Sequence, residues 1–184
     1  MRDIVAFHPT ARGAALYSVS GRADLAERRP DALSGGGIVF SARPVKLKQR
    51  ICLELRRRRL IAPAADPPDN DVVPGSARIG FTRHDPATLV KTMPAFAVPD
   101  LTDRDGFWAR PVGDVGVDGR VTVWLDDGDC ARWNVNGADR GVLVDGLPVD
   151  MPLWLLVDLY GPVTSTRLIP PGTSFIVRDK AKTM

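Results

Sequence analysis

The ten-residue stretch Pro152-Leu-Trp-Leu-Leu-Val-Asp-Leu-Tyr-Gly161 decides the fold of this chain. A membrane-spanning helix needs about 20 apolar residues. This shorter run, bounded by Pro and by Gly-Pro, predicts a β-strand. Because side chains alternate between the two faces of a strand, one face is entirely aliphatic and the other mixes rings with a carboxylate. The aliphatic face, which suits a core, holds Leu153, Leu155, Val157 and Leu159, and the mixed face holds Trp154, Leu156, Asp158 and Tyr160.

Further short apolar runs between Gly and Pro turn signals indicate the fold class. The chain contains 17 Gly and 16 Pro, and this spacing predicts an all-β antiparallel sandwich with little helix. Additional strands are predicted at 37–41, 50–56, 77–82, 121–126, 130–135 and 166–169. The Asp-Gly and Asn-Gly pairs at 127–128 and 136–137 indicate tight hairpins. The only helical turn expected covers 87–90, with Asp85 as its N-cap and Pro86 at its first position.

Composition indicates one ordinary globular domain. The chain has 184 residues, of which 44% are hydrophobic, and a net charge of +3, which is too small to indicate a nucleic-acid-binding protein. The two cysteines, Cys52 and Cys130, make neither a disulfide framework nor a zinc site, so we expect reduced thiols. No signal peptide or transmembrane segment is recognisable. We therefore expect a soluble cytoplasmic protein.

Two segments are expected to lie outside the packed domain, which we place at 1–175. Residues 62–75 are rich in Pro, Asp and Asn, which favour turns and cannot join a central strand. We interpret them as a mobile loop. Residues 176–184 are expected to form a frayed tail.

Seven segments follow one another in an order typical of a known family. Phe7-His-Pro-Thr-Ala-Arg-Gly13, Ile38-Val-Phe-Ser-Ala-Arg-Pro44 and Arg78-Ile-Gly-Phe-Thr-Arg-His-Asp-Pro86 are similar to its FH…G, FS-x-RP and GFT-x-x-DP elements. Met93-Pro-Ala-Phe-Ala-Val-Pro-Asp-Leu101, Gly106-Phe-Trp-Ala109 and Asn134-Val-Asn-Gly137 are similar to its LP-x-(Y/F)-A-x-PDL, G-(F/Y)-WAK and N-x-G motifs. Together with the strand at 152–161, they make the chain resemble the neuralized homology repeat from about Phe7 to Ile169.

The resemblance implies a β-sandwich related to SPRY-type domains, with a concanavalin-like jelly roll, that binds proteins. Members usually belong to E3 ubiquitin ligases or their adaptors, where the repeat selects a partner such as the intracellular tail of a Notch ligand. Some repeats also bind phosphoinositides. Here the Pro-rich loop replaces the family's Trp-Gly turn, and two Cys and two His are too few for a RING, which takes about eight such ligands. We expect a recognition domain of a longer ligase or of an adaptor.

Catalytic motifs are not recognisable. His84 next to Asp85 suggests a base and its orienting carboxylate, but Asp85 is better explained as a helix cap. The sequence holds no G-x-S-x-G elbow and no phosphate-binding glycine motif. We expect no catalytic residue, cofactor or metal in this chain.

A run of four arginines, Arg56, Arg57, Arg58 and Arg59, creates a local positive charge. One interpretation is a phosphoinositide site on a membrane surface. The other is a solvated strand end, balanced by the acidic residues of the following loop. Aromatic residues do not interleave with the run, so nucleic acid is not expected.

The outward side chains of three predicted strands form the candidate binding site for an intracellular protein or peptide. If the strands share one sheet, a single face holds aromatic, cationic and amide groups of the kind enriched at binding hot spots. The predicted partner-binding residues are Trp124, Arg132, Asn134, Trp154, Asp158 and Tyr160. The alternative is that another segment of the chain, from Met93 to Trp108, covers this face.

Overall fold

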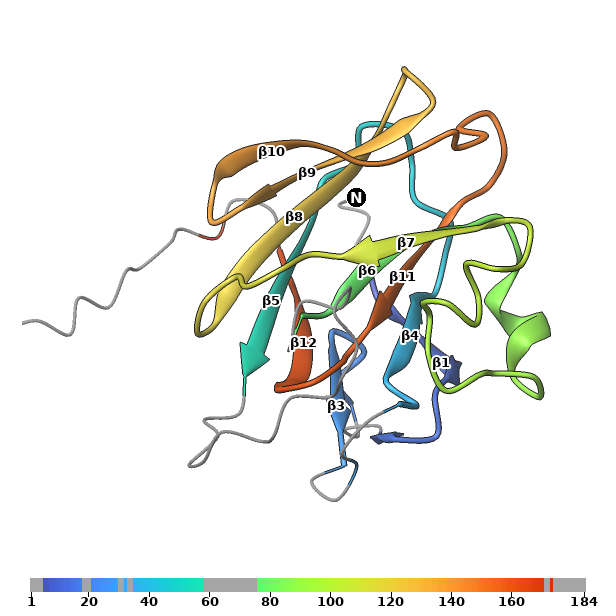
Figure 1. The fold of residues 1–184 in the computed structure, drawn as a ribbon, viewed down its shortest axis with the longest axis vertical. Coiled ribbons are helices and arrows are strands. Elements are labelled where there is room, and N and C mark those ends of the chain that lie inside the picture. The colour runs from blue at the N-terminus through green and yellow to red at the C-terminus, as the bar shows by residue number, and fades with distance from the viewer. Residues whose placement is uncertain are drawn as a thin grey trace, which may run out of the picture.

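The computed structural model describes residues 5–17, 21–29, 32, 35–57, 76–170 and 173. Within them, two antiparallel sheets pack into a sandwich (Figure 1). The five-stranded sheet has the order β1 (Phe7–Arg12), β4 (Ile38–Ser41), β11 (Trp154–Asp158), β6 (Arg78–Thr82) and β7 (Phe107–Pro111). The seven-stranded sheet has the order β10 (Ala138–Asp145), β9 (Cys130–Val135), β8 (Gly119–Asp126), β5 (Ile51–Arg57), β12 (Val163–Ile169), β3 (Leu25–Arg28) and β2 (Leu16–Tyr17). The predicted all-β sandwich is confirmed.

The main core lies between the two sheets. The inner side of β11 contributes Leu155 and Val157, flanked by Leu153 and Leu159, and all four side chains are fully buried as expected. Strand β8 alternates strictly between buried and half-buried residues, because its even-numbered side chains point to solvent. The period-two pattern therefore assigned the inward face of each of these strands correctly.

A second, smaller core covers the outer face of the five-stranded sheet. The segment between β6 and β7, residues 83–106, runs outside β4 and β1 (Figure 1). It begins with the predicted turn, a 3-10 helix at Pro86–Leu89 whose N-cap Asp85 accepts a hydrogen bond from the Ala87 amide at 2.9 Å. We call 83–106 the covering segment. The residues buried in this second core are Ala11, Ile38, Phe40, Leu89, Ala97, Leu101, Phe107 and Leu156.

Five strands were missed by the sequence pattern, and the reasons differ. Strand β1 contains Pro9 and pairs irregularly with β4, whereas β10 is an edge strand with mostly exposed residues. Neither has the alternation on which the prediction depended. The missed strands are β1, β2, β3, β7 and β10.

The two predicted hairpins connect β8, β9 and β10 in order. Positive φ falls on Asp129 (52°) in the first and on Asn136 (50°) and Gly137 (86°) in the second, as tight hairpins require. The predicted loop at 62–75 and tail at 176–184 lie outside the described residues. In the described part of the chain, no helix is long and apolar enough to span a membrane.

Candidate functional site

The mixed face of β11 lies beneath the covering segment. Leu156 and Asp158 are 0% exposed, whereas Trp154 and Tyr160 are half-buried. The Asp158 Oδ2 atom accepts a hydrogen bond from the Ala97 amide at 2.9 Å. The expectation that Asp158 faces a partner is therefore wrong, because a segment of the same chain occupies that position. The alternative, coverage by residues 93–108, is confirmed.

Asp158 belongs to a buried charged cluster. Arg78 Nη1 lies 3.6 Å from Asp158 Oδ2, and the two side chains are 4% and 0% exposed. The Arg78 guanidinium carbon lies 3.5 Å from the centroid of the Tyr160 ring, and Phe96 of the covering segment meets that ring edge to face at 6.0 Å. The cluster thus ties β6, β11 and the covering segment together.

Burial dominates the electrostatics of this cluster. Loss of hydration raises the pKa of the Asp158 carboxyl, although the Ala97 N–H and the Arg78 and Arg28 guanidiniums act in the opposite direction. Burial also lowers the pKa of Arg28, which donates to the carbonyl oxygens of Gly161 at 3.0 Å and Ala32 at 2.9 Å. These contacts are structural, and they leave only the exposed parts of Trp154 and Tyr160 for a partner.

The other predicted residues lie on the outer face of the seven-stranded sheet. The pairing of β8 with β9 sets Trp124 opposite Arg132 and Thr122 opposite Asn134. The Arg50 guanidinium carbon lies 4.1 Å from the centroid of the Trp124 ring, a cation–π contact. On the next strand, Val142 stands opposite Arg132 and is 44% exposed. Arg50, Trp124, Arg132 and Val142 form a row across four neighbouring segments, which we call the Trp124 row.

The six predicted partner-binding residues do not form one face. Trp124, Arg132 and Asn134 belong to the seven-stranded sheet, and Trp154, Asp158 and Tyr160 belong to or follow a strand of the five-stranded sheet. The outer faces of a sandwich point in opposite directions. The assumption of one shared sheet is wrong, because alternation along a strand reports the face but not the neighbouring strands.

The described arginines of the basic run are each paired with an acid. Arg56 Nε lies 3.2 Å from Glu54 Oε1, and Arg57 Nη1 bonds to Asp114 Oδ1. The pKa of Asp114 is lowered by the Gly116 amide first and by Arg57 as well. Arg58 and Arg59 lie outside the described residues. In the described part of the run, acidic neighbours therefore offset the positive charge at the end of β5.

The histidine considered for catalysis, His84, is held by packing and by a backbone contact. The His84 ring stacks on Phe107 with centroids 4.9 Å apart, and its Nε2 lies 2.8 Å from the Asp105 carbonyl oxygen. Asp85 caps the 3-10 helix instead of orienting the ring. Among the described residues, no three His, Cys, Asp or Glu side chains are grouped for a metal.

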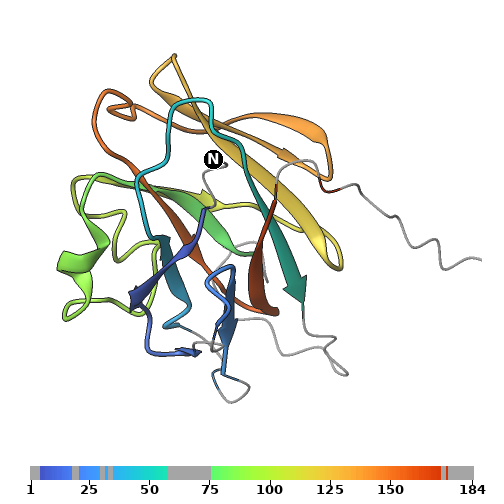
Figure 2. The same cartoon turned by 180° about the vertical axis from the view of Figure 1, so that it is seen from behind.

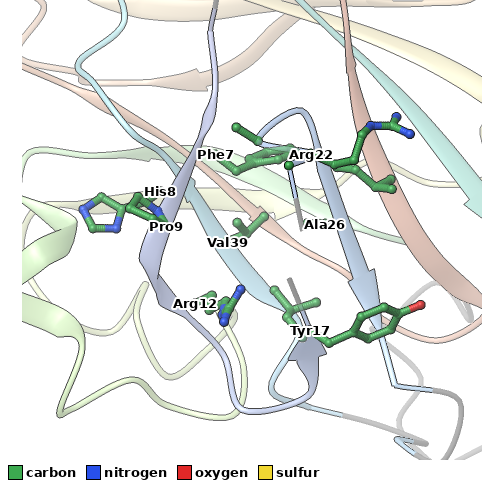
Figure 3. A pocket seen from close by; sticks show the side chains of 12 residues that line it. Phe7, His8, Pro9, Arg12, Tyr17, Arg22, Ala26 and Val39 are labelled. Carbon is green, nitrogen blue, oxygen red and sulfur yellow. The ribbon is translucent and has the colours of Figure 1, made fainter. Parts of the chain in front are cut away.

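A pocket at one edge of the sandwich was missed by the sequence. It has a volume of about 320 Å³ and opens between β1 and the β2–β3 hairpin (Figure 3). Its walls are made mainly by Phe7, Leu16, Ala26 and Val39, residues of the main core. Because β1 itself was not recognised from its sequence, no signal pointed to this pocket.

Comparison with known proteins places the chain in a family. The Neuralized family model matches residues 7–170. The human E3 ubiquitin-protein ligase NEURL3 is 35% identical over 176 residues, which cover 94% of this chain and 62% of that protein. Protein neuralized of Drosophila melanogaster is 33% identical over 134 residues, which cover 72% of this chain and 16% of that protein. This chain thus spans less than two thirds of either relative.

Solved structures agree with these sequence relatives. The crystal structure of the Drosophila melanogaster neuralized-NHR1 domain matches with a TM-score of 0.77 and 28% identity, covering 92% of this chain and 99% of that one. The TRIM65 PSpry domain matches with a TM-score of 0.54 and 12% identity over 90% of this chain and 92% of that one, so it shares the fold alone. The chain belongs to the Neuralized family, and its two-sheet sandwich is a neuralized homology repeat domain.

Proposed function

We propose that this domain binds a partner protein and presents it for ubiquitination, as the recognition part of a neuralized-type E3 ligase or of an adaptor. Two similar proteins support the proposal: the human relative is named as an E3 ubiquitin-protein ligase, and the matching fly structure is an isolated NHR1 domain. In this proposal the domain selects the partner, and another part of the ligase supplies the catalytic chemistry. The partner is an intracellular protein or peptide, and the domain acts in the cytoplasm.

The Trp124 row is the observation that most favours a partner-binding face. Trp and Arg are enriched at the centres of protein interfaces, where they supply large contact areas and charge-assisted hydrogen bonds. The Trp124 ring is already held by Arg50, so little side-chain freedom remains to be lost on binding. We place the main contact at Trp124, Arg132 and the adjacent Asn134. The half-buried rings of Trp154 and Tyr160 form a separate, minor candidate on the opposite face.

Binding through side chains is also favoured by the form of the sheet edges. Edge strand β1 contains Pro9, and edge strand β10 shows register shifts on both sides of Val142. Proline and bulges are devices that prevent another strand from adding to an edge. A partner is therefore expected to dock on a face or in a pocket.

The phosphoinositide alternative receives no support from the described residues. Both Arg56 and Arg57 have acidic neighbours that offset their charge. We therefore do not extend it into a second proposed function.

The test compares three forms of the domain: wild type, Trp124→Ala and Val117→Ala. Val117 is 75% exposed and lies away from the row, so it controls for loss of exposed apolar surface. Partners are identified by proximity labelling in cells, and the affinity of each purified partner is then measured by calorimetry. Truncating a hot-spot aromatic typically costs at least about 2 kcal/mol, a loss of more than about tenfold in affinity. Unchanged affinity of a folded Trp124→Ala domain would contradict the assigned face, and binding to anionic vesicles alone would favour the lipid alternative.

A further inference from the structure

The edge pocket gives solvent access to the main core. Figure 2 shows β1 and β3 beside one another at the end of the sandwich, one from each sheet. The Phe7 amide donates to the Ala23 carbonyl oxygen at 2.8 Å and closes one end of the gap. Beyond that bond the two strands are not paired, because they belong to different sheets. The pocket is the space left between them.

The walls of this pocket are apolar. Phe7, Ala26 and Val39 are 6%, 5% and 2% exposed, and Figure 3 shows their side chains between β1 and β3. A volume of about 320 Å³ lies at the lower end of the range for small-molecule sites, about 300–1,000 Å³. The pocket is therefore large enough to take one aliphatic or aromatic side chain.

The rim is basic. Arg12 of β1 and Arg22, which precedes β3, both line the pocket. Arg22 shares Asp24 with Arg167, at 2.9 Å and 3.2 Å, so two guanidiniums compete for one carboxylate. Within the described part of the chain, the guanidinium of Arg12 forms no hydrogen bond or ion pair, whereas its backbone pairs with Val39 in the sheet. Among the described residues, the Arg12 guanidinium is therefore the rim charge left for an incoming carboxylate.

We propose that the edge pocket binds one aliphatic or aromatic side chain of a partner protein, with a carboxylate of the same partner beside Arg12. The apolar walls remove the side chain from water, and the guanidinium fixes the polar group next to it. The partner chemistry is thus an apolar residue adjacent to an Asp, a Glu or a C-terminus. The proposal rests on the role in protein recognition, but it concerns a site distinct from the Trp124 row.

The test uses small probes that carry the proposed chemistry, observed by NMR on the isotope-labelled chain. 4-Methylpentanoate has an aliphatic group and a carboxylate, 4-methylpentanamide lacks the charge, and acetate lacks the aliphatic group. We expect saturable millimolar shifts at the Ala26 and Val39 amides with the first two probes and none with acetate. The carboxylate should bind about two- to fivefold more tightly than the amide, as for a partly exposed ion pair.

Two variants and one control separate the contributions. Arg12→Ala should abolish the preference for the carboxylate and leave the affinity for the amide unchanged. Ala26→Leu should fill the pocket and abolish binding of both probes. Arg83→Ala removes a guanidinium from the covering segment, away from the pocket, and should change neither. Because Arg12 lies on the rim, its variant keeps the proposal testable even if Ala26→Leu does not fold.

Three results would overturn the proposal: the absence of saturable shifts at the pocket, equal affinity for the carboxylate and the amide in wild type, or displacement of a second copy of the chain by the probes in sedimentation experiments. Failure of the proposed function is distinguishable from these results. In that case the probes bind at the pocket, while proximity labelling in cells finds no partner protein of the domain.

Discussion

Truncation of the buried carboxylate, Asp158→Ala, should destabilise the packing of the covering segment on the five-stranded sheet. Asp158 is 0% exposed and accepts the Ala97 N–H, so truncation leaves that buried amide without an acceptor. An unsatisfied buried donor costs about 1–3 kcal/mol, and the small void left by the carboxyl adds about 1 kcal/mol. The free energy of unfolding should therefore fall by about 2–4 kcal/mol. For a domain of this size each kcal/mol shifts Tm by about 2–4 °C, so Tm should fall by about 4–16 °C.

Asp158→Asn should cost much less, within about 1 kcal/mol of wild type at neutral pH. The amide oxygen can still accept the Ala97 N–H and fills the same volume. Burial raises the pKa of Asp158, which means that the folded state favours the neutral carboxyl. Its stabilising contribution is therefore complete below the unfolded pKa of about 3.9 and decreases as the pH rises through the folded value. Asparagine imitates that neutral form at every pH.

The assay is urea and thermal unfolding of both variants, together with hydrogen exchange at the Ala97 amide. Asp105→Ala is the matched control, because its carboxylate is 84% exposed and pairs with Arg83. It should lose less than about 1 kcal/mol. Exchange at Ala97 should accelerate in Asp158→Ala alone, since local opening of the covering segment no longer breaks a hydrogen bond. If Asp158→Asn were as destabilising as Asp158→Ala, the lost stability would come from the ion pair with Arg78 and not from the Ala97 hydrogen bond. That result would refute the reasoning.

Three further changes test other features of the fold. The pKa of Asp24 is lowered to about 2, mainly by its hydrogen bond from the Arg22 side chain. Asp24 should therefore stabilise the fold above its unfolded pKa. This contribution should vanish as the pH falls toward 2. In Asp24→Asn the free energy of unfolding should depend less on pH in the acid range. The difference should be less than about 1 kcal/mol, because solvent screens the partly exposed pair. An unchanged pH dependence would contradict this. Gly80→Ala should prevent folding, judged by circular dichroism, because a Cβ would lie 1.8 Å from the Trp108 carbonyl oxygen. Replacing 62–75 by a short Gly-containing turn should leave Tm unchanged, as its composition predicts; a large decrease would mean that this segment packs on the core.

The sequence by itself determined the class of the fold and the inward face of its central strands. Alternation along 121–126, 130–135 and 152–161 indicates which side chains avoid water, because hydrophobic burial acts on each strand separately. The Asp-Gly and Asn-Gly pairs likewise predicted the two hairpins, although in the first the positive φ falls on Asp129, next to the pair, and not on the pair itself. The resemblance to the neuralized homology repeat was confirmed by the family comparison.

Only the tertiary structure decided which strands became neighbours and what covered their outer faces. Trp124 and Trp154 have similar local patterns, yet strand pairing places them on opposite sheets. Asp158 became a buried acceptor because residues 83–106, far from it in sequence, fold back over β11. The edge pocket exists because β1 and β3 meet without pairing. Each of these results depends on contacts between segments distant in sequence, and the periodicity of one strand holds no information about such contacts.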